Sequence, residues 1–226
     1  MKRLTLKLLA CAGLFALLPA QSQTAAGLYD PEPPANSSYL RLIHAAQDGV
    51  LDVLVDGKLR IKQLAPGHAS DYLVLPAGQH KISLNLKGKT LIELPFDCVG
   101  THAYSLAYNS LKADAKPMVF EDKTIANKLK ATLTAYHLQN PGPTFDVMTA
   151  DGKLTVFPAL AAASHAVRAV NPISVELVAN SGGNKLAQTK VEMLQGGSYS
   201  VLFIGDSQGK LLAHTLQNKI ERYTGK

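Results

Sequence analysis

Apolar and polar residues alternate along several short segments of the chain. Residues 39–44 read Tyr-Leu-Arg-Leu-Ile-His. The same two-residue period recurs in three further segments, residues 81–87, 129–136 and 173–178. Because successive side chains of a strand point to opposite faces, this period predicts strands with one buried face. In the first segment Leu40 and Leu42 would face the core, and Arg41 would lie on the other face.

Turn-forming residues separate these segments about every 8 to 12 residues, a spacing typical of sandwiches and small barrels. The Asp-Gly pairs at 56–57 and 151–152 predict two-residue hairpin turns, because glycine accepts a positive φ. No stretch keeps a helical period, and the alanine-rich residues 159–163 are expected to be irregular. The pattern therefore predicts an all-β fold.

The second half of the chain repeats the first at an offset of about 94 residues. The matched blocks keep the same order: LDVLVDGK at 51–58 with FDVMTADGK at 145–153, His44 with His137, Ser70 with Ser164, and Tyr104-Ser105-Leu106 with Tyr199-Ser200-Val201. A repeat of this length predicts two copies of one small domain. We expect two tandem β-sandwich domains, Ig-like or jelly-roll-like and related by internal duplication, at 38–122 and 123–216, followed by a polar, mobile tail at 217–226.

The N-terminus has the pattern of a secretory signal peptide. Basic residues precede an apolar run at 8–20, which is shorter than the ~20 residues that a membrane span needs. We expect residues 1–22 to be removed, with cleavage extending to residue 26 as the alternative. Leu-Leu-Ala-Cys at 8–11 resembles a lipoprotein box, but it lies inside the apolar run. Residues 27–37 are rich in proline and predict an extended leader into the first strand.

Charge and cysteine content change once the signal peptide is removed. The net charge falls from +6 to +3, and Cys98 is left as a single cysteine in an apolar strand, where a buried, inert thiol is expected. Residues 23–122 carry nine Lys and Arg against eleven Asp and Glu, whereas 123–226 carry eleven against six. The excess positive charge therefore lies in the second half.

Nucleic acid is not expected as a partner, because aromatic residues do not interleave with the basic ones.

Candidate catalytic groups are present but lack the partners that their chemistry needs. Gly205-Asp206-Ser207 resembles the nucleophile block of SGNH hydrolases, but no Asp-x-x-His pair follows to activate the serine, so a turn is expected. The seven histidines show no metal-ligand spacing. Asp52 and Asp146 recur beside valine in both halves. They lie in different predicted domains, so solvent-facing strand residues or hydrogen bonding within the hairpin is expected rather than a catalytic carboxylate pair. We expect no catalytic residue, no metal and no cofactor.

Several blocks resemble the AlgF family of periplasmic alginate O-acetylation proteins. They are LYDPEPP at 28–34, SYLR at 38–41, LAPG at 64–67, SDY at 70–72, LPAG at 75–78, DGK at 151–153 and NP at 171–172. The resemblance covers the predicted exported chain. It implies two tandem β-sandwich domains and a periplasmic location. It also implies a part in adding acetyl groups to mannuronate O-2 and O-3, beside a membrane-bound O-acyltransferase and SGNH-type acetyltransferases.

Three functions are consistent with these observations. The preferred one is a non-catalytic adaptor within the acetylation machinery. The alternatives are a transient acetyl carrier or acetyltransferase subunit, and a module that binds an acidic polysaccharide. The residues expected to contact a partner or polymer are drawn from the leader and from the basic positions: Tyr29, Pro31, Pro33, Pro34, Arg41, Lys153 and Arg168.

Overall fold

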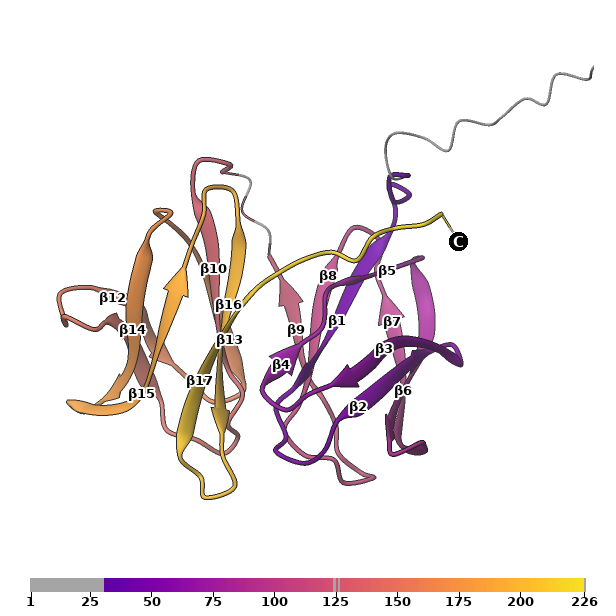
Figure 1. Ribbon diagram of the computed structural model, residues 1–226, viewed down its shortest axis with the longest axis horizontal. Helices are drawn as coiled ribbons and strands as arrows, with labels where there is room; N and C mark the ends of the chain where they lie inside the picture. Colours follow the sequence, from indigo (N-terminus) through magenta and orange to yellow (C-terminus); the bar gives the residue numbers. More distant parts are fainter. Residues whose placement is uncertain (1–30, 124, 126, 226) are drawn as a thin grey trace, which may run out of the picture.

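The computed structural model describes residues 31–123, 125 and 127–225, and the secondary structure of these residues is strand and turn (Figure 1). The first nine strands are β1 (Ser38–His44), β2 (Leu51–Val55), β3 (Lys58–Leu64), β4 (His68–Ala69), β5 (Leu73–Leu75), β6 (Gly78–Leu86), β7 (Lys89–Cys98), β8 (Ala103–Tyr108) and β9 (Met118–Asp122). The other eight are β10 (Ala131–His137), β11 (Phe145–Thr149), β12 (Thr155–Leu160), β13 (Ser164–Val170), β14 (Ser174–Ser181), β15 (Asn184–Glu192), β16 (Ser198–Gly205) and β17 (Leu211–Gln217). The prediction of an all-β fold is confirmed.

Membrane-spanning helices are absent from this part of the chain: none of its segments forms a helix long and apolar enough to cross a bilayer. The predicted signal peptide, its cleavage sites and Tyr29 lie outside the described residues.

Strands β1–β9 form one unit of two sheets. The outer sheet, which lies away from the second unit, has the order β3-β2-β6-β7. The inner sheet, which faces the second unit, has the order β4-β1-β8-β9, with β5 also paired to β1. Apolar side chains from both sheets, such as Leu42, Val53, Leu84 and Leu106, meet in one buried cluster. Burial of this apolar surface is what holds the two sheets together.

Strands β10–β17 form a second unit with the same topology. Its outer sheet runs β12-β11-β14-β15 and its inner sheet β13-β10-β16-β17. The pairing of β1 with β8 is parallel, and so is the equivalent pairing of β10 with β16. The core of this unit includes Leu133, Val147, Ala179 and Phe203.

The repeated aspartates have the same role in both units. Register shifts mark a bulge where β2 meets β3 and where β11 meets β12. Asp52 Oδ1 accepts the backbone N–H of Gln63 at 2.8 Å, and Asp146 Oδ1 accepts that of Ala159 at 2.7 Å. Gln63 and Ala159 both have a positive φ, which is costly for a side-chain-bearing residue. The aspartates therefore stabilise the bulge, as the hairpin interpretation expected.

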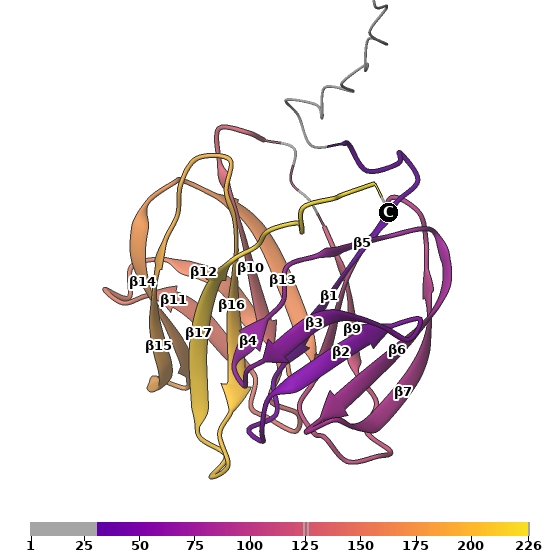
Figure 2. The ribbon, with the colours of Figure 1, turned by 45° about the vertical axis from the view of Figure 1, so that its right-hand side comes forward.

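The two inner sheets pack face to face, so the molecule has four layers of sheet (Figures 1 and 2). A third apolar cluster fills the space between them, and it includes Ile43, Phe120, Tyr136 and Leu202. Both faces of β1 are consequently buried, one in each cluster. The expectation of one solvent-facing side is wrong here, because the second unit covers the face that carries Arg41.

Two local expectations also need correction. The Asp-Gly at 56–57 forms the expected two-residue turn, with positive φ at both residues, but the second hairpin has a longer loop. That loop spans 150–154 and is closed by Gly152 N–H donating to Thr149 O. The alanine-rich residues 159–163 begin within β12 and continue into a turn.

The polar tail is fixed where it leaves β17. It crosses from the second unit to β5 of the first, as both views show (Figures 1 and 2). Tyr72 N–H donates to Lys219 O at 2.8 Å, and Glu221 N–H donates to Tyr72 O at 2.9 Å. The expectation of a mobile tail is therefore wrong for residues 219–221, whose backbone pairs with Tyr72 of the other unit.

The repeated histidines, His44 and His137, are fully buried near the ends of β1 and β10. His44 Nε2 lies 3.1 Å from Gly49 O, and His137 Nδ1 lies 3.3 Å from Leu160 O. Burial disfavours the charged imidazolium and lowers the pKa of both rings. The other nitrogen of each ring has no hydrogen-bond partner.

This burial predicts a loss of stability in acid. Because the folded-state pKa is lower than the unfolded value, the unfolded chain binds protons first as the pH falls below about 6.5. We expect the free energy of unfolding, measured by urea titration, to decrease over that range. The double variant His44→Asn, His137→Asn should show a shallower decrease. The same pH dependence in both proteins would contradict this account.

Candidate functional site

A buried arginine joins the two units. Arg41 has no exposed surface, and its guanidinium lies between the inner sheets. It donates four hydrogen bonds, from Nε to Ser105 Oγ (2.7 Å), from Nη1 to Asn218 Oδ1 (2.6 Å), and from Nη2 to Tyr136 OH (2.8 Å) and Ser200 Oγ (3.1 Å). Ser105 belongs to the first unit, whereas the other three acceptors belong to the second unit or the tail that follows it. One side chain therefore bonds both halves of the chain.

Asp122, at the end of β9, supplies a negative charge on the far side of these hydroxyls. Its carboxylate accepts hydrogen bonds from Tyr136 OH, from Ser105 Oγ at 2.5 Å and from Tyr72 OH at 2.8 Å. Ser105 and Tyr136 thus accept from Arg41 and donate to Asp122. The opposite charges are linked through two hydroxyl groups, which lets each charge polarise the bonds of the other.

Two tyrosine rings complete the surroundings of the guanidinium. The Arg41 Cζ atom lies 4.6 Å from the ring centre of Tyr72 and 5.3 Å from that of Tyr136, within the range of cation–π attraction. Burial, together with the negative charge of Asp122, raises the pKa of Tyr136 to about 12 and raises that of Tyr72 further. Both phenols therefore keep their protons and act as donors to the carboxylate.

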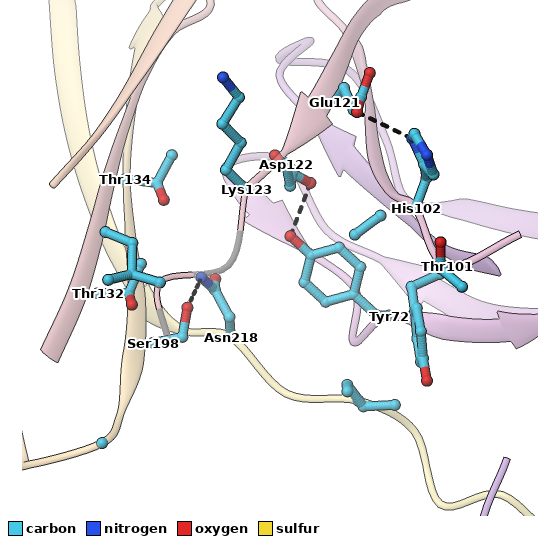
Figure 3. Close-up of a pocket in the computed structure, with 15 residues that line it drawn as sticks. Tyr72, Thr101, His102, Glu121, Asp122, Lys123, Thr132, Thr134, Ser198 and Asn218 are labelled. Atoms are coloured by element: carbon cyan, nitrogen blue, oxygen red, sulfur yellow. Dashed lines mark hydrogen bonds and ion pairs between the residues drawn. The ribbon is translucent and has the colours of Figure 1, made fainter. Parts of the chain in front are cut away.

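A cleft of about 800 Å³ lies between the two units beside this network (Figure 3). Its lining includes the network residues Tyr72, Asp122 and Asn218. Toward the first unit His102 Nδ1 lies 3.0 Å from Glu121 Oε1, and toward the second unit Ser198 Oγ accepts from the Asn218 amide (Figure 3). Six of the lining residues carry a hydroxyl group and one, Asn218, carries an amide, and the lining has charges of both signs. It suits a polar ligand or a polar protein loop better than an apolar one.

The tail forms one wall of the cleft. Asn218 and Ile220 line it, and Ile220 pairs with Tyr72 as an isolated bridge. Glu221 then forms an ion pair with Arg60, and Glu221 Oε1 accepts Val74 N–H at 2.7 Å. These contacts hold the tail across the junction of the two units as a strap.

The contact residues expected from the sequence lie on separate elements. Pro31 and Pro34 are exposed and Pro33 is half-buried, all in the leader before β1. Lys153 is 84% exposed in the loop between β11 and β12, and Arg168 is exposed on β13. Arg41 is an interior residue, so the expectation that it lies on an accessible face is corrected. It contacts the protein's own second unit, which covers it.

The candidate nucleophiles have structural roles. Ser207 lies in the turn between β16 and β17, where Asp206 Oδ1 accepts the N–H groups of Gln208 and Lys210, each at 2.8 Å. The turn interpretation is confirmed. Cys98 is buried, and burial raises the pKa of its thiol, which disfavours the reactive thiolate. Within the described ranges, no cluster of three or more His, Cys, Asp or Glu could hold a metal ion.

Comparison with known proteins decides the family. The family model described as "Alginate O-acetyl transferase AlgF" matches residues 9–201. The chain belongs to the AlgF family. It is 27% identical to an alginate biosynthesis protein AlgF of Pseudomonas fluorescens over 91% of this chain and 89% of that protein. It is 29% identical to its Pseudomonas aeruginosa counterpart, over 93% and 92% of the two chains.

A solved structure of the C-terminal domain of AlgF from P. aeruginosa is also similar. It is 28% identical, covers 40% of this chain and 100% of its own, and superposes with a TM-score of 0.34.

One signal in the sequence pointed to the network of this AlgF-family chain. The repeated Tyr-Ser-Leu and Tyr-Ser-Val blocks contain Ser105 and Ser200, and both serines bind Arg41. Asp122, Tyr72 and Asn218 have no such repeat and were missed. They come together only because two sheets and the tail meet at one point.

Replacing Arg41 should destabilise the protein strongly. Arg41→Met leaves the half-buried Asp122 carboxylate and several buried hydroxyls without their cation, and removing one charge of a buried ion pair costs about 3–5 kcal/mol, which is the upper bound here. Arg41→Lys keeps the charge but loses the planar guanidinium with its several fixed N–H donors, so we expect a decrease in stability smaller than that of Arg41→Met. The measurement is the free energy of unfolding in urea.

Arg168→Met is the matched control, since it removes an exposed arginine from the other inner sheet and should change stability by less than about 0.5 kcal/mol. Equal effects of Arg41→Met and Arg168→Met would contradict a central role for Arg41.

Loss of the Glu221 carboxylate should loosen the strap. Glu221→Gln removes the charge that pairs with Arg60 and weakens the hydrogen bond that Glu221 accepts from Val74 N–H. We therefore expect faster hydrogen exchange at the Val74 and Tyr72 amides. A cost on the order of 1 kcal/mol is expected for a partly exposed pair with one charged hydrogen bond. Glu192→Gln, which affects an exposed pair, serves as the control. Unchanged exchange at both amides would show that Glu221 does not hold the tail.

Proposed function

We propose that this protein is a non-catalytic periplasmic adaptor in alginate O-acetylation. The observation that carries the proposal is the match of the AlgF family model to residues 9–201, which supports a role in alginate biosynthesis and O-acetylation. As an adaptor, it would work beside a membrane-bound O-acyltransferase and SGNH-type acetyltransferases. Its task would be to hold these partners together rather than to transfer acetyl groups itself.

The geometry supports an adaptor in two ways. First, the two candidate nucleophiles for an acyl-enzyme lie in structural positions: Ser207 is in a turn and Cys98 is in the core. Second, one apolar cluster holds the sheets together within each unit, and the Arg41 network and a third apolar cluster hold the two units together. A body of this kind presents loops and sheet edges in a fixed arrangement, which reduces the entropy lost on binding.

The contact surfaces of the adaptor would lie on the leader and on the basic second unit. Pro31 and Pro34 are exposed, and because the proline ring fixes φ, the segment loses little conformational freedom when it docks. Lys153 and Arg168 are exposed on the unit that carries the excess positive charge. We propose these as the contacts with acetylation proteins.

We also propose that the two units are Ig-like or jelly-roll-like β-sandwich domains that arose by duplication, with boundaries near 38–122 and 123–216. The support is the shared sheet order, the parallel pair in each inner sheet, and the aspartate at each bulge. Independent changes would not be expected to reproduce all three features.

Association with purified acetyltransferase subunits tests the adaptor role. We expect the unaltered protein to bind at least one folded subunit in a titration calorimeter. Lys153→Glu combined with Arg168→Glu should weaken binding by about tenfold or more, since two favourable charges become repulsive. Lys87→Glu with Lys89→Glu, on a hairpin of the first unit, is the control.

Absence of binding to every subunit would remove the adaptor proposal. A second measurement addresses catalysis: the intact mass after incubation with an activated acetyl ester should be unchanged. A gain of one acetyl group that disappears in Ser207→Ala or Cys98→Ala would instead favour an acetyl carrier.

A further inference from the structure

Three aliphatic side chains are strongly exposed at one end of the second unit. Leu129 is 72% exposed, Leu194 71% and Ile173 52%. They lie on the loops that precede β10, connect β15 to β16, and connect β13 to β14. These loops meet at one end because β10, β14 and β16 begin there, whereas β13 and β15 end there. We call Leu129, Ile173 and Leu194 the aliphatic patch.

Hydrogen bonds tie the three loops together. Gly196 N–H donates to Lys130 O at 3.0 Å, which joins the loop of Leu194 to that of Leu129. Met193 N–H donates to Ile173 O at 3.1 Å, and Lys130 Nζ donates to Asn171 Oδ1. The patch is therefore presented on a connected set of loops.

The charged residues of the three loops have one sign. Lys128 and Lys130 flank Leu129, and the loop residues 127–130, 171–173 and 193–197 contain no Asp or Glu. The nearest carboxylate along the chain from Leu194 belongs to Glu192, which is paired with Lys190 at 2.6 Å. The patch thus combines exposed aliphatic groups with two lysines that face no carboxylate in these loops.

We propose that the aliphatic patch docks on the surface of an anionic lipid bilayer. Aliphatic side chains gain free energy by entering the acyl boundary, while lysines at the same level are attracted to anionic headgroups. The composition favours lipid over a protein partner, because protein interfaces are enriched in aromatic residues, Met and Arg and depleted in Lys. The loops that carry the patch contain two lysines and no aromatic residue or arginine.

Docking in this way would orient the cleft. Gly196, in the Leu194 loop, and Ser198, at the start of β16, also line the cleft between the two units. The rim of the cleft would then face the bilayer, within reach of a membrane-embedded protein. The membrane proposal does not rest on the adaptor role, since vesicle binding needs no acetylation protein.

Vesicle flotation with the protein purified from the exported fraction tests the proposal. We expect binding to vesicles of phosphatidylglycerol and phosphatidylcholine, weakening as salt is raised, and much weaker binding to phosphatidylcholine alone. Leu129→Ser with Leu194→Ser should weaken binding by about tenfold or more. Lys128→Gln with Lys130→Gln should give a similar loss on anionic vesicles only.

The controls separate the patch from general effects of charge and apolar surface. Leu59→Ser removes an exposed leucine from the first unit, and Lys87→Gln with Lys89→Gln removes two exposed lysines from its β6–β7 hairpin. Both should stay within twofold of the unaltered protein, and urea unfolding checks that every variant is folded.

No binding to anionic vesicles, or equal binding of the patch variants, would overturn the proposal. If the patch variants instead bind vesicles normally but lose an acetyltransferase subunit, the patch is a protein contact and the adaptor role stands. If vesicle binding is absent while subunit binding is retained, only the membrane proposal fails.

Discussion

The arrangement of this protein depends on one buried guanidinium. Removing Arg41 from water carries a desolvation penalty of several kcal/mol, which is recovered only when its donors are satisfied and a counter-charge is near. Four hydrogen bonds and two aromatic rings meet this requirement, and Asp122 supplies the charge through Ser105 and Tyr136. Since the partners come from both units and the tail, the requirement is met only when all three are in place.

The cleft follows from the same constraint. The inner sheets are held face to face by the network and by an apolar cluster beside it. The lining contains polar groups because it includes residues bonded within the network, and Asn218 and Ile220 of the strap form part of its wall. The polar cleft and the basic end of the second unit are two distinct surfaces on one body. Under the proposed adaptor role, these two surfaces would let the protein contact more than one partner at once.

Much of the local structure could be predicted from sequence. Alternation located four of the strands, β1, β6, β10 and β14. The Asp-Gly pair at 56–57 formed its two-residue turn, and the repeated aspartates proved to stabilise hairpin bulges. The longer loop at 150–154 was missed because loop length depends on how β11 and β12 pair. The tail was missed because its bonds are with the other unit, at Tyr72 and Arg60.

The sequence by itself determined the all-β class, the internal repeat and the family. These depend on short-range periodicity and on residues close along the chain, which are visible without coordinates. Only the tertiary structure decided that Arg41 is an interior residue and that Asp122 and Asn218 belong to its network. The physical reason is that alternation shows which side chains share a face but not what covers that face. A second sheet covers it here, and an arginine that would be a surface residue on an isolated domain becomes the link between two.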